Sequence, residues 1–113
     1  MTYPLTQKLL PTIIATAARD GFAEVTRTAD GAHIRALTIF EGFDAGEEVT
    51  VTDRALEGAI IQWAGETTAT AGEQTADVLT VANAVMDGHI DSFQLTAPQH
   101  HQVILYWAAQ MPF

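Results

Sequence analysis

The sequence predicts an α+β domain in which a helix is followed by a three-stranded antiparallel sheet and then by two to three further helices. Three observations support this class. Apolar residues recur at helical spacing near the amino terminus, strand-forming residues follow in one block around Asp30-Gly31, and helical spacing returns after Asp53. Consecutive strands with segregated helices are typical of α+β proteins. The chain of 113 residues, 48% of them apolar, is expected to form one domain over residues 1–113.

The first expected element is an amphipathic helix over residues 4–20. Gly21 suits the position that follows a final helical turn. Pro11 is expected to kink this helix, or to divide it so that Pro11 lies near the start of a second piece, where a missing N–H costs little. The apolar positions at helical spacing are Leu5, Leu9, Leu10, Ile13, Ile14, Ala17 and Ala18.

A β-hairpin is expected next, with strands over residues 22–29 and 32–40. The dipeptide Asp30-Gly31 suits the positive-φ positions of a type I′ turn, which is the usual two-residue connection between antiparallel strands. A two-residue loop at this place fixes the register of the hairpin. It pairs Val25 with Ala36, Phe22 with Ile39 and Thr26 with Arg35.

A short third strand and a second helix follow. Alternation over residues 48–52 predicts the strand, after a loop that contains Gly42 and Gly46. Thr52 or Asp53 can cap the helix, which is expected to end at Gly65. The apolar stripe of this helix comprises Ala55, Leu56, Ala59, Ile60 and Trp63.

Capping-box patterns predict two more helices, over residues 73–87 and 97–110, with a loop over residues 66–72. Residues 89–95 fit either a short strand or an irregular connection. The last helix is apolar on nearly every side, so it must be packed centrally or lie at an interface. Its candidate interface residues are Leu105, Tyr106, Trp107, Met111 and Phe113.

Composition excludes several classes of function. The absence of Cys removes disulfides, thiolate nucleophiles and cysteine zinc sites, and it fits a reducing compartment, so we expect a cytoplasmic protein. The net charge of −9 opposes direct binding to nucleic acid. No stretch has the length of about 20 apolar residues that crosses a bilayer. A signal peptide over residues 9–18 is not expected, because Lys8 is the only basic residue before this apolar run and Pro11 interrupts the run.

Motifs for catalysis are missing. The single Ser92 lies in no nucleophile elbow, and no glycine-rich phosphate loop occurs, so no cofactor is expected. One group of side chains could nevertheless bind a divalent metal and activate water: Asp87, His89, Asp91 and His100. Its spacing matches no metal signature, and His101 points about 100° away from its neighbour on a helix. A small metal-dependent hydrolase or ligand-binding domain is therefore an alternative interpretation.

Charge asymmetry is the strongest candidate for function. Residues 1–40 carry four basic and three acidic groups, whereas residues 41–113 carry eleven acidic groups and only Arg54. Such a surface can dock on a basic partner, with carboxylates in place of phosphates. Helix-dipole stabilisation and solubility are the competing explanations. The densest acidic set is Glu41, Asp44, Glu47, Glu48, Asp53 and Glu57.

The sequence thus favours a small non-enzymatic binding protein of the inhibitor or accessory type, with a basic protein as partner, for example one that handles nucleic acid. Small acidic inhibitors used by mobile elements against host nucleases offer an analogy of size and charge. A homo-oligomeric assembly subunit that self-associates through the last helix is the other interpretation. No motif in the chain assigns it to a family.

Overall fold

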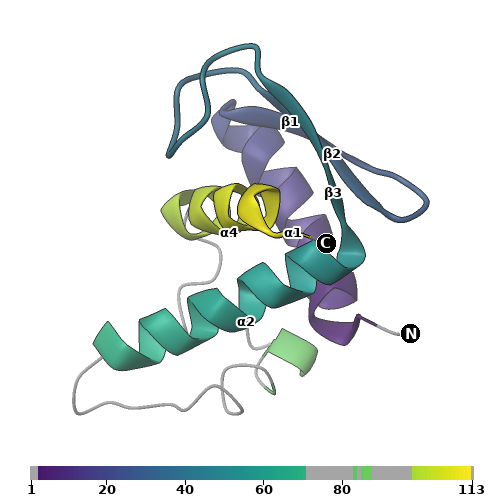
Figure 1. The fold of residues 1–113 in the computed structure, drawn as a ribbon, viewed down its shortest axis with the longest axis vertical. Helices are drawn as coiled ribbons and strands as arrows, with labels where there is room; N and C mark the ends of the chain where they lie inside the picture. The colour runs from purple at the N-terminus through teal and green to yellow at the C-terminus, as the bar shows by residue number, and fades with distance from the viewer. Residues whose placement is uncertain (1–2, 71–82, 84, 88–97, 113) are drawn as a thin grey trace.

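The computed structural model describes residues 3–70, 83, 85–87 and 98–112, and it confirms the α+β class (Figure 1). A helix, a three-stranded antiparallel sheet and later helices follow one another as predicted. The elements are α1 (Pro4–Asp20), β1 (Ala23–Arg27), β2 (Gly31–Ala36), β3 (Glu48–Thr52), α2 (Asp53–Thr70) and α4 (Pro98–Gln110).

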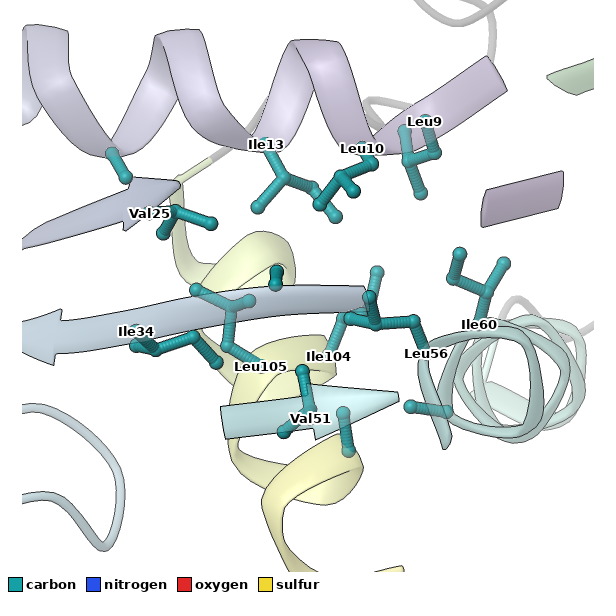
Figure 2. Packing of buried hydrophobic residues seen from close by; sticks show 14 of the residues in the cluster. Leu9, Leu10, Ile13, Val25, Ile34, Val51, Leu56, Ile60, Ile104 and Leu105 are labelled. Carbon is teal, nitrogen blue, oxygen red and sulfur yellow. The ribbon is translucent and has the colours of Figure 1, made fainter. Parts of the chain in front are cut away.

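The core lies between one face of the sheet and the three helices. The strand order is β1-β2-β3, and α1 packs on β1, while α4 packs on β3, α1 and α2. Figure 2 shows side chains from all these elements meeting in one cluster. The labelled ones are Leu9, Leu10, Ile13, Val25, Ile34, Val51, Leu56, Ile60, Ile104 and Leu105. Each such side chain stabilises the fold by about 1.5–3 kcal/mol when fully buried. The last helix is therefore central, which was one of its two expected positions.

Helix α1 confirms the first expected element. It runs without a break from Pro4 to Asp20, so the division into two pieces at Pro11 is not observed. Pro11 lies on the exposed face of the helix. Gly21 ends α1 with φ 72°, and its N–H donates to the Ala17 carbonyl oxygen over 2.9 Å. This left-handed residue is the cap that the sequence predicted.

The hairpin is confirmed, but its predicted turn and register are wrong. Val25 pairs with Ile34 rather than Ala36, and Thr26 pairs with His33 rather than Arg35. The reversal is centred on Ala29-Asp30, where the Thr28 N–H donates to the Gly31 carbonyl oxygen over 2.9 Å. Among the described residues only Gly21, Glu41 and Gly46 have positive φ, so the turn at Asp30-Gly31 is not type I′. The second strand also ends at Ala36 rather than at position 40.

Close packing of β2 against β3 explains why a glycine occupies position 31, which the sequence pattern suggested was part of the turn. A Cβ atom on Gly31 would lie 1.9 Å from the carbonyl oxygen of Val51 and 2.8 Å from the Cα of Thr52. Only glycine lets β3 approach β2 this closely. Gly31 therefore belongs to the β2–β3 interface, and β3 occupies the predicted residues 48–52.

Helix α2 begins as predicted but ends later. The Ala55 N–H donates to the Thr52 hydroxyl oxygen over 3.0 Å, which confirms Thr52 as a cap. The helix continues through Gly65 to Thr70, so the predicted end and most of the predicted loop over 66–72 are wrong. A glycine inside a helix costs about 1 kcal/mol, which is small beside the burial of a neighbour such as Trp63.

The last third of the chain is described in part. Helix α4 confirms the helix expected over residues 97–110. Asn83, Val85 and Met86 are helical, in agreement with the end of the helix expected over residues 73–87. The rest of that helix and the connection over residues 89–95 lie outside the described residues. Within the described part of the chain, no helix is both long and apolar enough to span a membrane.

Candidate protein-interaction surface

Glu57, one of the six predicted docking carboxylates, acts inside the fold. Its Oε1 accepts the Thr6 N–H over 2.8 Å and the Thr6 hydroxyl over 2.9 Å, and its Oε2 accepts the Leu5 N–H over 3.2 Å. These are first-turn donors of α1, which have no partner within their own helix. Tyr3 at the N-cap supplies no side-chain hydrogen bond, and Pro4 has no N–H. Glu57 therefore caps α1 from α2.

Asp53 is also engaged within the molecule. Both of its carboxylate oxygens accept hydrogen bonds from Arg27, and the Nη2 to Oδ2 distance is 3.0 Å. The hydrogen bond from Arg27 to Asp53 raises the pKa of the guanidinium above its ordinary value. Arg27 Nη1 donates in addition to the Gly31 carbonyl oxygen over 3.2 Å. This pair ties the end of the hairpin to the start of α2.

The other four carboxylates are exposed. Glu41, Asp44 and Glu47 lie in the connection between β2 and β3, residues 37–47, which we call the acidic loop. Glu48 follows at the start of β3, where its Oε1 lies 3.0 Å from His33 Nε2. The acidic loop contains three carboxylates and no Lys or Arg. It therefore presents unbalanced negative charge to solvent.

A row of four aromatic side chains packs the acidic loop against the rest of the protein, and two of them, Phe40 and Phe43, belong to the loop itself. Ring centroids are 5.1 Å apart for Phe22 and Phe40, 4.9 Å for Phe40 and Phe43, and 5.8 Å for Phe43 and Tyr106. The first and last of these pairs are edge-to-face, an arrangement that contributes about 0.5–1.5 kcal/mol beyond the area buried. The three phenylalanines are buried. The loop is thereby attached to Phe22, the residue that precedes β1, and to α4.

Backbone contacts fix the tip of the loop. Phe40 and Phe43 exchange hydrogen bonds of 3.3 and 2.8 Å across a tight turn in which Glu41 has φ 48°. A Cβ on Gly42 would lie 2.1 Å from the ring of Tyr106, so the tyrosine lies directly against the turn. A non-glycine residue at positive φ persists only where its surroundings hold it.

The acidic loop also exposes apolar side chains that the sequence pattern had predicted to lie in a strand. Ile39 is 76% exposed and Leu37 is 40% exposed. The alternation of side chains along the strand already indicated that Leu37 and Ile39 would face solvent. Residues two apart share a face of a strand, and both have the parity of the solvent-facing Arg35 rather than that of the buried Ile34.

The candidate interface on the last helix is only partly accessible. Leu105 is fully buried in the core, whereas Tyr106, Trp107 and Met111 are half-buried and pack against it. Phe113 lies outside the described residues. The apolar character of α4 is thus explained largely by its central position.

Among the described residues, His100 contacts Trp63. Trp63 Nε1 donates to His100 Nδ1 over 2.7 Å, and the two rings are edge-to-face with centroids 5.3 Å apart. Burial lowers the pKa of His100, which favours the neutral ring that can accept this bond. Asp87 is exposed, and His89 and Asp91 lie outside the described residues. Within the described part of the chain, no three metal-ligating side chains form a group.

Comparison with known proteins gives no guide to function. No family model matches the chain, and searches of curated proteins and of solved structures find no significant similarity. The function must therefore be argued from the surface itself.

Proposed function

We propose that the protein is a non-enzymatic binding protein that docks its acidic loop on a basic surface of a partner protein. One observation carries the proposal: a single short loop presents Ile39, 76% exposed, among three carboxylates and no cation. An isolated exposed isoleucine would be unremarkable, but interfaces combine apolar anchors with a charged rim.

The two kinds of side chain have different tasks. Glu41, Asp44 and Glu47 attract a basic surface at long range and raise the association rate. Ile39 and Leu37 supply the apolar area that is removed from water in the complex and slows dissociation. The aromatic contacts that Phe40 and Phe43 of the loop make with Phe22 and Tyr106 hold the loop in place before binding, which reduces the ordering entropy lost in the complex.

The class of partner follows from the charge. A basic protein groove that handles nucleic acid binds phosphates at regular positions, and carboxylates on a rigid loop can occupy some of these positions. The protein would then act as an inhibitor or accessory factor of that partner. Its own net charge of −9 opposes a direct contact with nucleic acid.

Charge reversal tests the proposal. The loop variant carries Glu41→Lys, Asp44→Lys and Glu47→Lys. The control variant carries Asp20→Lys, Glu24→Lys and Asp87→Lys, all at exposed positions outside the loop. Each replacement of a carboxylate by lysine changes the charge by two, so both variants have a net charge of −3 instead of −9. The two variants therefore differ in the position of the replaced carboxylates and not in net charge. Wild type and both variants are tagged and used to capture proteins from a nuclease-treated lysate, with elution in rising salt.

We expect wild type and the control variant to retain the same basic protein, and the loop variant to lose it. Ile39→Ser should leave the association rate with that protein nearly unchanged and raise the dissociation rate by about tenfold, the equivalent of ~1.4 kcal/mol. Equal retention by the loop variant and the wild type would rule out the acidic loop as the docking element.

A further inference from the structure

A second surface feature lies at the other end of the sheet. A hollow of about 430 Å³ opens beside α1 and the end of β1, whereas the acidic loop follows the opposite end of β2. Sites for small molecules commonly have volumes of about 300–1,000 Å³. The residues that line the hollow are Thr6, Gln7, Leu10, Pro11, Ile14 and Arg27.

Five of the six described residues that line the hollow lie on α1, and the sixth, Arg27, is the last residue of β1. Leu10, Pro11 and Ile14 form an apolar wall on α1. Leu10 is buried and Ile14 is half-buried against the core, so packing restrains both side chains. Among the described residues that line the hollow, Arg27 is the one that carries a charge.

Arg27 is held in place and still has donors to offer. Its Nη1 and Nη2 bind the two oxygens of Asp53, and Nη1 donates also to the Gly31 carbonyl oxygen. A guanidinium carries five N–H donors in a fixed plane. The Nε–H and the outer Nη2–H form a second parallel edge, and no described residue accepts from it. This edge can give two hydrogen bonds to one acceptor oxygen, or one to each of two.

Charge selects the kind of acceptor. Asp53 already neutralises Arg27, and the lining residue Thr6 contacts the carboxylate of Glu57. Within the hydrogen-bonded groups formed by Arg27 with Asp53 and by Thr6 with Glu57, two negative charges therefore stand beside one positive charge. An anionic ligand would be repelled, whereas a neutral carbonyl oxygen can accept from the guanidinium edge without adding charge.

We propose that this hollow binds an uncharged small molecule with an apolar, ring-sized body and a carbonyl oxygen, the body lying on Leu10, Pro11 and Ile14 and the oxygen accepting from Arg27. This site is independent of the docking function of the acidic loop.

Prodan, an uncharged naphthalene with a ketone group, is a suitable probe because its emission shifts to the blue in apolar surroundings. We expect saturable binding to the wild type. Ile14→Trp fills the hollow and should weaken binding by about tenfold or more. The matched control is Ala15→Trp, at the neighbouring exposed position of α1 that does not line the hollow. It should bind as the wild type does.

Two further comparisons test the chemistry. Arg27→Lys keeps the charge but removes the planar edge, so it should weaken prodan binding, whereas Arg35→Lys on the outer sheet face should not. Anilinonaphthalene sulfonate, an anionic probe of similar size, should bind more weakly than prodan. Unchanged prodan binding in Ile14→Trp, or tighter binding of the anionic probe, would overturn the proposal.

The loop variant keeps this test separate from the proposed function. It leaves the hollow unchanged, so prodan should bind to it as to the wild type even if partner capture is lost. Loss of prodan binding in the loop variant alone would show that the probe binds at the acidic loop instead, and would contradict the site. Thermal unfolding of each variant confirms that the fold is retained.

Discussion

Gly31 has a role that depends on a distant strand. In the sequence it stands beside Asp30, where a turn is the natural interpretation, and in the structure it lies against the backbone of β3. Local pattern cannot distinguish a glycine that supplies positive φ from one that makes room for a neighbouring chain. This explains why the hairpin was predicted correctly while its register was wrong.

Replacing Gly31 by alanine should therefore destabilise the protein through overpacking. The new Cβ meets backbone atoms of Val51 and Thr52, which cannot rotate away, so we expect a loss of about 2–3 kcal/mol in the free energy of unfolding. Gly46→Ala is the control: φ is 88°, but among the described residues no atom beyond the two chain neighbours lies within 4 Å of the new Cβ, so only backbone strain of about 1 kcal/mol is added. Urea denaturation measures both. A milder effect at Gly31 than at Gly46 would contradict the observed β2–β3 packing.

His100 should make stability depend on pH. Its folded-state pKa is lowered by burial, so the unfolded chain binds a proton more readily. The contribution of this group to the free energy of unfolding is complete above about pH 6.5, the ordinary pKa, and is lost progressively as the pH falls below it. Protonation of Nδ1 would also remove the acceptor for the Trp63 N–H.

The comparison variant is His100→Gln, whose amide oxygen can accept from Trp63 but does not titrate. Urea denaturation followed by tryptophan fluorescence over about pH 5–8 should give a flatter dependence for the variant than for the wild type. Parallel curves for the two proteins would show that His100 does not titrate differently on unfolding.

At the scale of elements, the apolar periodicity predicted the helices and strands whose boundaries are set by local sequence, and it missed the boundaries and caps that depend on tertiary packing. Helices α1 and α4 and strand β3 were predicted almost to the residue, because apolar spacing and caps lie within each segment. The end of α2 was missed, since the glycine at position 65 is outweighed by packing. The cap of α1 was also missed. Tyr3 followed by Pro4 was the available signal, because a helix start without Ser, Thr, Asp or Asn needs an acceptor from elsewhere.

Glu57 offers a test of this helix-to-helix cap. Glu57→Gln removes the charge and one of the two acceptor oxygens that Leu5 and Thr6 use, so we expect a loss of about 1 kcal/mol in the free energy of unfolding. Amide hydrogen exchange at Leu5 and Thr6 should become faster. Glu48→Gln, on the exposed face of the sheet, should change stability by less than about 0.5 kcal/mol. Equal effects at both positions would exclude a capping role.

For the whole molecule, the structure divides the acidic set that the sequence treated as one surface. Asp53 and Glu57 join α1, the hairpin and α2, whereas Glu41, Asp44 and Glu47 remain on a loop with exposed apolar neighbours. Charge counts along a chain cannot make this division. It depends on whether a backbone N–H or a guanidinium from another element lies within hydrogen-bond distance, and that is set by tertiary packing.

Salt should therefore act in opposite directions on folding and on binding. Self-repulsion at a net charge of −9 destabilises the compact state, so raising salt from about 0.01 M to about 1 M, which shortens the Debye length from ~30 Å to ~3 Å, should raise the melting temperature. The same screening should slow association with a basic partner. Both effects should shrink in the loop variant. In the control variant, the effect on folding should shrink while association keeps most of its salt dependence, because the loop is intact. A melting temperature that falls with salt would mean that the ion pairs of Arg27 and Arg35 outweigh repulsion among the carboxylates.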